Sequence, residues 1–210
     1  MQIEQALVAN GLGAGIAEDG LLGLASNDVR AGSEALAAHA LRLGFPISDY
    51  VLSADAPRGV FIVAEHTGDQ HDALRYLKLG PGPLYTLVRN YHLLHLEIPR
   101  TIRRVLDQRH VLLTNTAQPR IGVAAIAKRA LAPGERIDHG IGSFAVRGIA
   151  VRLQAHPGHV PIGLIRNAVV QRAVAPGAML TFGDLALPDS LAVRAWHEIT
   201  AGIARVAACE

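Results

Sequence analysis

Apolar residues recur at helical and strand spacings through the first half of the chain, which predicts a mixture of helices and strands. The segment SEALAAHALRL carries a helical stripe of leucine and alanine, so we expect a helix over residues 33–43 with Ser33 as its N-cap. The apolar run VFIVAE predicts a strand over residues 60–65 that is buried on both faces up to Glu65. Residues 3–9 fit a strand or a short helix equally well.

A dense polar stretch follows in residues 69–99. We expect a helix over residues 69–79, with Lys78 in its last turn, where the helix dipole favours a cation. The sequence Gly-Pro-Gly-Pro then predicts a tight turn. The alternation in LYTLVR, residues 84–89, is typical of a strand, and Pro99 fits the first turn of another helix.

The second half predicts a compact β-module built on a sequence repeat. RALAPGERI at residues 129–137 and RAVAPGAML at residues 172–180 each fit a strand, a Pro-Gly turn and a second strand. We therefore expect two copies of one β-hairpin. A last amphipathic helix follows, and either Asp189 or Ser190 can cap it. The whole pattern predicts the α+β class.

Composition narrows the classes of function. Of the 210 residues, 50% are hydrophobic and 18% are charged, which is typical of a folded protein with a core. The formal net charge is only +2 and no run of five basic residues occurs, so duplex DNA binding is disfavoured. Aromatic residues make up 4%, too few for a surface that stacks single-stranded bases. We expect no nucleic-acid partner.

Other sequence features bear on localisation. No apolar run approaches the roughly 18 residues that a membrane helix needs, and the first residues lack the charged and apolar regions of a signal peptide. The single cysteine, Cys209, excludes intrachain disulfides and cysteine-based metal clusters. We expect a cytoplasmic protein without a membrane partner.

Residues 76–99 concentrate the side chains that can carry chemistry. We single out His92 and Glu97 as candidate catalytic residues, because an imidazole oriented by a carboxylate exchanges protons near neutral pH. The resemblance described below adds Lys78 as a third. Guanidinium and phenol groups can grip a carboxylate or phosphate of a small molecule. The candidate substrate-binding residues are Glu65, Tyr85, Arg89, Tyr91 and His95.

Each candidate also fits a plain structural role. Lys78 fits a solvent-exposed lysine at a helix end, and an ion pair between Arg89 and Glu97 is an equal alternative to substrate binding. His92 and His95 fit hydrogen bonding between domains. A metal ion would need a third firm ligand on the same face, so we expect no metal site.

The repeat region resembles the SAF domain, a β-clip unit, in IAKRALAPGERID, IGSFAVRG and PIGLIRNAVVQRAVAPGAMLTFGDLAL. The upstream segment GVFIVAEHTGDQHDALRYLKLGPGPLYTLVRNYHLLHLEIPRTI resembles the neighbour of SAF in homoserine-dehydrogenase-like oxidoreductases. This resemblance covers most of the chain from about Glu4. It implies the substrate-facing half of a dehydrogenase that pairs as a homodimer, with Lys78 at the position of the family's proton-transferring lysine. Asn90 departs from the family pattern, which has proline there.

The resemblance also implies how the chain is divided. Residues 1–118 would form an α+β domain of the substrate-binding and dimerisation type, with a sheet and helices. Residues 119–188 would form the SAF-like β-clip domain, and residues 189–210 a C-terminal helix.

The Rossmann domain that usually comes first in this family has no counterpart in the sequence. The glycines of GLGAG, residues 11–15, do not complete a dinucleotide loop, because Ile16 stands where a small residue is needed. No acidic residue ends a following strand about 20 positions on, as the ribose contact requires. We expect a flexible turn here and no cofactor site on this chain.

Three functions remain open. The first, which we favour, is a cofactor-independent enzyme of the kind found in secondary metabolism, which uses acid–base chemistry for cyclisation, isomerisation or elimination on a small molecule. The second is the catalytic half of a split NAD(P)-dependent oxidoreductase, with a Rossmann domain on a partner chain. The third is a non-catalytic module that binds a ligand.

Overall fold

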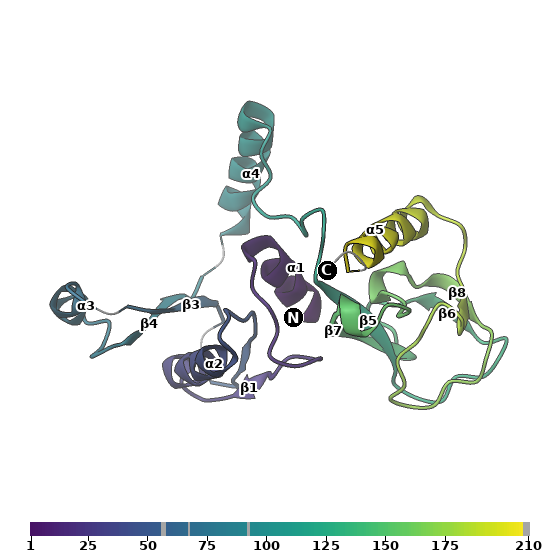
Figure 1. Ribbon diagram of the computed structural model, residues 1–210, viewed down its shortest axis with the longest axis horizontal. Coiled ribbons are helices and arrows are strands. Elements are labelled where there is room, and N and C mark those ends of the chain that lie inside the picture. Colours follow the sequence, from purple (N-terminus) through teal and green to yellow (C-terminus); the bar gives the residue numbers. More distant parts are fainter. Residues whose placement is uncertain (56–57, 67, 92, 208–210) are drawn as a thin grey trace. The chain divides into compact units, whose positions relative to one another are not determined.

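The computed structural model describes residues 1–55, 58–66, 68–91 and 93–207 (Figure 1). They form two compact units. The first, here the terminal unit, joins Met1–Leu21 to Asn115–Glu210, and the second, the central unit, is Leu22–Thr114. Helices and small, mostly antiparallel sheets make up both units, so the predicted α+β class is confirmed. No helix in the described ranges is long and apolar enough to cross a membrane.

Helix α1 (Gln2–Leu12) settles the ambiguity over residues 3–9, and it belongs to the terminal unit. The buried side chain of Asn10 fixes it there. Its amide oxygen accepts the backbone N–H groups of Arg120 and Ile121 at 2.9 Å, and its amide nitrogen donates to the Ile121 carbonyl at 2.8 Å. A buried side-chain amide whose oxygen and nitrogen both have hydrogen-bond partners strongly favours a single packing of the helix that carries it. This explains why the first residues pack with a strand more than a hundred positions later.

The terminal unit is built on two small sheets. Strands β5 (Ile121–Ala127) and β7 (Val146–Arg152) pair antiparallel, and the second sheet has the order β6–β8–β9. The bounds of the second sheet's strands are Arg136–His139, Arg166–Val170 and Leu185–Ala186. Two single-turn helices, η1 (Leu153–Ala155) and η2 (Ile162–Leu164), lie between β7 and β8.

The main hydrophobic core lies within the terminal unit. It is made largely of small and branched side chains, as the low aromatic content requires. Its fully buried members are Ala125, Ala127, Leu131, Ile137, Ala145, Val146, Val160, Ile162, Ile165, Ala168, Val170, Val174, Leu180 and Leu185.

The two copies of the sequence repeat are not hairpins, which corrects the prediction. The first copy leads from β5 to β6, yet β5 pairs with β7, and β6 pairs with β8. The second copy leads from β8 to Met179, which bridges back to Ile126 of β5. Each copy therefore leads from one sheet to the other. The Pro-Gly turn changes the direction of the chain, but the segments before and after the turn do not pair with each other.

The copies instead cross and bond to each other. The N–H of Gly134 donates to the Val170 carbonyl at 2.7 Å, and the N–H of Gly177 donates to the Ala127 carbonyl at 2.8 Å. These are equivalent bonds at equivalent repeat positions, so the module has an internal pseudo-twofold relation. Both glycines have left-handed backbone angles, with φ of 85° and 80°, that favour glycine.

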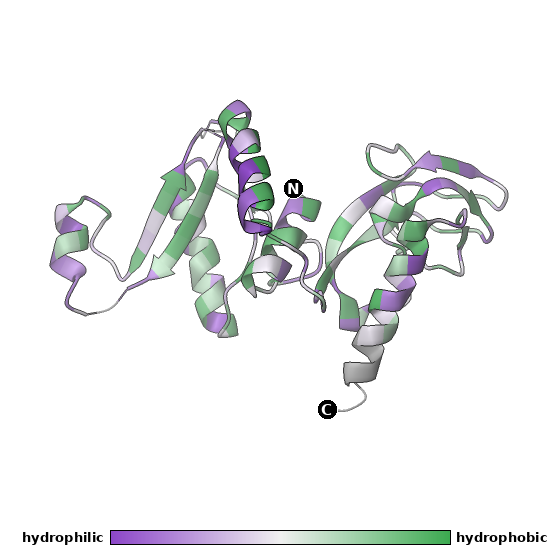
Figure 2. Ribbon diagram, turned by 90° about the horizontal axis from the view of Figure 1, so that it is seen from above, coloured by the Kyte–Doolittle hydropathy of each residue, from purple (hydrophilic) through white to green (hydrophobic). Residues whose placement is uncertain are grey.

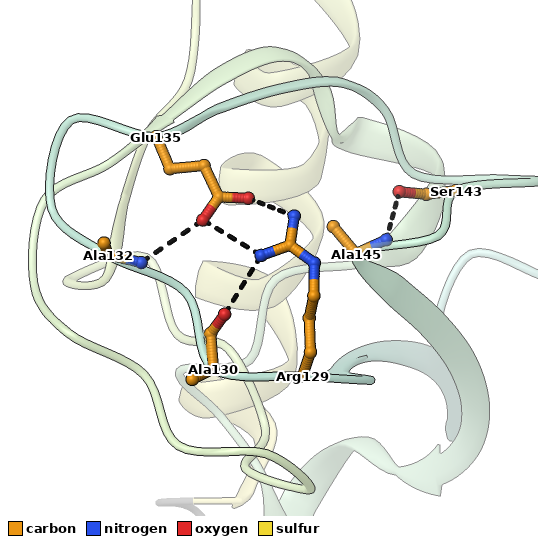
Figure 3. A network of polar contacts seen from close by, with 6 residues as sticks. All are labelled: Arg129, Ala130, Ala132, Glu135, Ser143 and Ala145. Carbon is orange, nitrogen blue, oxygen red and sulfur yellow. Dashed lines mark hydrogen bonds and ion pairs between the residues drawn. The ribbon is translucent and has the colours of Figure 1, made fainter.

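An arginine and a glutamate close the first copy of the repeat (Figure 3). Arg129 donates to Glu135 at 2.5 Å and to the Ala130 carbonyl at 3.0 Å, while Glu135 also accepts the Ala132 N–H. The hydrogen bond from Arg129 lowers the pKa of the Glu135 carboxyl. In the second copy Ala178 replaces the glutamate, and the matching arginine pairs elsewhere.

Helix α5 (Leu191–Ala207) ends the described chain. The predicted cap is confirmed for one of its two candidates, because the Ser190 hydroxyl accepts the Val193 N–H at 3.2 Å. Asp189 instead forms an ion pair with Arg194 at 3.7 Å.

The central unit starts with a parallel strand pair joined by a helix. Strands β1 (Leu24–Ala25) and β2 (Val51–Leu52) flank helix α2 (Val29–Leu43). The predicted helix start at residue 33 is four residues late, because Asp28 accepts the Arg30 N–H at 2.9 Å and caps the helix.

An antiparallel pair follows, formed by β3 (Val60–Glu65) and β4 (Leu84–Arg89), with the short helix α3 (His71–Tyr76) between them. Helix α2 packs on one face of this pair. There the hydroxyls of Ser33 and Thr86, both buried, lie 3.0 Å apart. Ser33 is therefore a packing residue inside the helix and not its predicted cap.

The other face of the β3–β4 pair is open within the described chain. Val60 and Ile62 of β3 are 57% and 64% exposed, and Leu87 of β4, opposite Ile62, is exposed too. The prediction that this strand is buried on both faces is wrong, because the central unit supplies a helix for one face only. Figure 2 shows the apolar colouring along both strands.

Helix α4 (Leu94–Gln108) is amphipathic, and none of its described residues is buried. Its apolar stripe is exposed and consists of Leu94, Ile98, Ile102 and Val105. Pro99 lies within this helix and not in its first turn, because the helix begins five residues earlier than the proline alone indicates.

Candidate functional site

The Gly-Pro-Gly-Pro turn brings a tyrosine of β4 against a histidine of α3. The buried Tyr85 hydroxyl lies 3.0 Å from Nδ1 of His71, and the two rings meet edge to face. Gly82 has φ of 71°, and a Cβ there would lie 2.3 Å from the tyrosine oxygen. The Gly82–Pro83 peptide bond is cis. The turn thus needs glycine at this position, since any larger residue would displace the phenol–imidazole pair.

Lys78 lies just after α3 and not in its last turn, where we had expected it. Its N–H donates to the Arg75 carbonyl at 3.0 Å, and the N–H of Leu79 donates to the Leu74 carbonyl at 3.1 Å. These two bonds define a Schellman motif, which normally has glycine at the left-handed position. Here that position, with φ of 60°, is held by Lys78.

The Lys78 side chain is exposed. It has no hydrogen-bond or ion-pair partner among the residues that the structure describes. Its strained backbone fixes the direction in which the side chain leaves the chain. A left-handed non-glycine residue of this kind is more common at functional sites than elsewhere.

An ion pair connects the end of β4 to the start of α4. Nη2 of Arg89 lies 2.6 Å from Oε1 of Glu97, with side chains that are 52% and 38% exposed. The same guanidinium lies 4.8 Å from the centre of the Tyr91 ring, a cation–π distance. The structure thus brings together three of the candidate residues, in the arrangement that the ion-pair alternative describes.

The other candidates are not part of this cluster in the described chain. Glu65 and His95 are exposed, and neither side chain has a hydrogen bond or ion pair to the Arg89–Glu97 pair. His92 lies outside the described residues. The catalytic and substrate-binding roles of all these residues remain predictions. Among the described residues, no group of three potential ligands could hold a metal ion.

Sequence reasoning missed His71, whose Nδ1 lies 3.0 Å from the hydroxyl of the candidate residue Tyr85. Its partner Tyr85 was a candidate, but nothing in the sequence pairs a histidine of α3 with the second residue of β4. The link arises only because the turn brings the start of β4 next to the first residue of α3.

Strands β1 and β2 run parallel with a helix between them, as in nucleotide-binding folds. The fit of a dinucleotide to this place can therefore be tested. A groove of about 580 Å³ lies at the carboxyl ends of both strands and is lined by Ser26, Asn27 and Ser53 among others. A dinucleotide site needs glycines before the helix and a free helix N-terminus for its pyrophosphate. Here the carboxylate of Asp28 occupies that N-terminus.

The glycine cluster near the N-terminus does not fit a dinucleotide either. Helix α1 runs through Gly11 to Leu12, and Gly13 is its left-handed C-cap with φ of 71°. Phosphates bind at the positive N-terminal end of a helix, and these glycines lie at the opposite end. The expectation of a turn holds for Gly13, while the glycine before it is helical. Neither of these two places therefore fits the pyrophosphate of a nicotinamide dinucleotide.

Comparison with known families adds an assignment for the first part of the chain. Residues 1–98 match the family model described as "Oxidoreductase DRL, catalytic domain". This part of the chain is similar to an oxidoreductase. The matched span contains all the candidate residues and ends before the sequence repeat. No curated protein matches the chain.

A histidine in the core of the terminal unit lies outside the matched span. Nδ1 of His159 bonds to the His156 carbonyl at 2.6 Å, and its Nε2 is buried without a partner in the described chain. Burial lowers the pKa of His159. Its ring meets that of Trp196, on α5, edge to face at 5.5 Å. A neutral imidazole whose Nδ1 carries the proton fits this position.

Proposed function

We propose that this chain is the substrate-binding half of an NAD(P)-dependent oxidoreductase, whose nicotinamide is held by a nucleotide-binding domain on a partner chain. The observation that carries the proposal is the similarity of residues 1–98 to an oxidoreductase catalytic domain. The misfit of the two places described above to a dinucleotide pyrophosphate supports the second part. The similarity gives no support to a cofactor-independent cyclase, isomerase or lyase.

The polar groups of the central unit would bind a small polar substrate. Arg89 is held by Glu97 through one nitrogen, which leaves other N–H donors of its guanidinium for a carboxylate or phosphate. Tyr91 packs against the same guanidinium and limits its movement. Lys78 follows α3, which contacts the start of β4 and not its end, so its role in proton transfer rests on the family resemblance alone.

Residues 119–188 of the terminal unit would be the SAF-like β-clip of a homoserine-dehydrogenase-like enzyme. The family match ends before this region, so the proposal rests on the quoted sequence patterns and on the crossed repeats. A module in which two copies interlock is a rigid support for neighbouring loops.

A second copy of the chain would cover the open face of the β3–β4 pair. The central unit has two uncovered apolar surfaces, this sheet face and the stripe of α4. Two copies related by a twofold axis can cover both in one contact, because each then offers its helix to the sheet of the other. A two-stranded sheet with one bare face is only marginally stable alone.

Nicotinamide binding and turnover test the oxidoreductase proposal. Calorimetric titration of the purified chain with NADH and NADPH should show no binding. Adding a Rossmann-domain protein encoded beside this chain should give substrate-dependent oxidation of the nicotinamide. Arg89→Gln should then raise KM, while Arg109→Gln, an exposed arginine outside the site, should not. Turnover by the chain alone, or nicotinamide bound to it alone, would refute the proposal.

A further inference from the structure

A groove of about 460 Å³ in the terminal unit lies where β6 ends and β8 begins. The residues that matter for its chemistry are Asp138, His139, Gly140, Ile141, Arg166 and Asn167. Its volume is within the range of small-molecule sites. It belongs to a different unit from the candidate residues of the central unit.

The polar side of the groove carries an arginine without a partner. The Arg166 side chain is exposed, and within the described chain it forms no hydrogen bond or ion pair. It pairs across the two strands with His139, so guanidinium and imidazole lie on the same face of the sheet. Two potential hydrogen-bond donors therefore lie next to each other at the edge of the groove.

The Asn167 side chain lies on the other face of the strand pair. Its backbone is left-handed, with φ of 50°, and its amide oxygen accepts from Nη2 of Arg136 at 3.2 Å. Arg136 lies on the opposite face from His139, because neighbouring residues of a strand point to opposite faces. Nε of Arg136 also lies 3.4 Å from Asp138, so the only carboxylate among these lining residues is already paired.

The segment that follows β6, residues 140–145, is a turn whose conformation is fixed by hydrogen bonds. Gly140 donates to the Ile165 carbonyl at 2.8 Å, and a Cβ on it would lie 2.3 Å from the Ile162 carbonyl oxygen. Farther along, the Ser143 hydroxyl accepts the Ala145 N–H at 3.0 Å (Figure 3), and Lys128 donates to the Ser143 carbonyl at 2.5 Å.

The turn presents apolar side chains to solvent. Ile141, which lines the groove, is 60% exposed, and Phe144 on the same turn is 92% exposed. Exposed apolar residues on a rigid turn are typical of binding surfaces, because an ordered anchor loses little conformational entropy when it is covered.

We propose that this groove binds a small molecule that combines a carboxylate or phosphate with a short apolar part. Arg166 contacts the anionic group, His139 donates beside it, and Ile141 covers the apolar part. The local charge favours an anion, since residues 128–170 contain six lysines and arginines but two acidic residues.

Amide chemical shifts of the isotope-labelled full chain test this site. Inorganic phosphate and butyrate are titrated separately, with sodium chloride at matched ionic strength. We expect saturable shifts at Gly140, Ile141 and Asn167 with one probe or both, which identifies the anion type. Chloride should not reproduce them. Shifts that chloride reproduces, or that never saturate, would overturn the proposal.

Two arginine variants locate the contact. Arg166→Gln should weaken binding about tenfold or more, because a charge-assisted hydrogen bond is lost. Arg147→Gln, on the exposed part of β7 and outside the groove lining, should bind like the wild type. Equal weakening in both variants would mean general electrostatic attraction and would refute the site. The readout is binding alone, so its outcome is separate from that of the oxidoreductase test.

Discussion

Leu131 and Val174 occupy the same place in the two copies of the sequence repeat and bond to each other in both directions. Each N–H donates to the carbonyl of the other at 3.0 Å. Both side chains are buried in the core of the terminal unit. A reciprocal pair of bonds between equivalent residues is what a twofold relation requires. The two copies of the repeat therefore pair with each other and do not form two independent turns.

The pseudo-twofold predicts matched effects at its two turns. Gly134→Ala and Gly177→Ala should each lower the free energy of unfolding of the terminal unit by about 1 kcal/mol, because alanine disfavours a left-handed backbone. Gly163→Ala is the control, since that glycine has no left-handed angle and has open space around it. Urea unfolding followed by Trp196 fluorescence measures all three. Markedly unequal costs at the two turns would contradict the equivalence.

The left-handed backbone of Lys78 should lower the stability of the central unit. Lys78→Gly is expected to stabilise the central unit by about 0.5 to 1 kcal/mol, because glycine relieves the left-handed strain but loses some entropy on folding. Lys78→Ala removes the same amine and keeps the strain, so it should show no gain. Thermal unfolding measured by circular dichroism compares the two. Equal stability of both variants would show that the backbone there is unstrained.

The Arg89–Glu97 pair should contribute little to stability. Both side chains are partly exposed, so a double-mutant cycle with Arg89→Gln and Glu97→Gln should give a coupling of about 0.5 kcal/mol. The pair's effect should be local, with faster hydrogen exchange in the first turns of α4 in either variant. A coupling several times larger would place the pair in a dry environment, such as one covered by a partner.

The buried His159 predicts acid sensitivity of the terminal unit. Its pKa is lowered below the ordinary 6.5 by burial, so the unfolded chain binds the proton more readily than the folded one. Stability is therefore complete above pH 6.5 and falls as the pH drops from there toward the lower folded pKa. Urea midpoints across this range, read from the fluorescence of Trp196, the only tryptophan, measure the slope.

A variant separates this histidine from the other titrating groups. His159→Leu should flatten the slope below pH 6.5, whereas His139→Gln, at an exposed position, should leave it unchanged. An unchanged slope in His159→Leu would contradict the prediction.

The open sheet face predicts a dimer that one substitution breaks. Ile62→Lys places a charge on the face that a second copy would cover, and should convert a dimer to a monomer in light scattering after gel filtration. Leu191→Lys, an equally exposed position in the terminal unit, should leave the dimer intact. A wild-type chain that is monomeric at micromolar concentration would refute the contact.

Local patterns in the sequence were sufficient where neighbouring residues decide the structure. The alternation in β4 correctly separates Tyr85 from Thr86, since opposite faces of a strand have different neighbours. The cap by Ser190 follows from one side chain and the next turn. The start of α2 was missed because both Asp28 and Ser33 are good caps, and only the buried contact of Ser33 with β4 distinguishes them.

Long-range features could not be read from the sequence. The crossing of the two repeats depends on which strand pairs with which. A hairpin and a crossover can have the same local sequence pattern of strand, Pro-Gly turn and strand. The contact of His71 with Tyr85 depends on the fold of the turn between them. The clamp by Asn10 joins positions more than a hundred residues apart, so no motif indicates it.

The crossed repeats have a consequence for how the terminal unit can be divided. Because each copy supplies the strand that completes the sheet of the other, neither half is a structure by itself. A chain cut at the exposed Gly158 would leave two fragments that are unfolded apart and regain order only when mixed. We therefore expect the two halves to complement each other, and neither to fold alone.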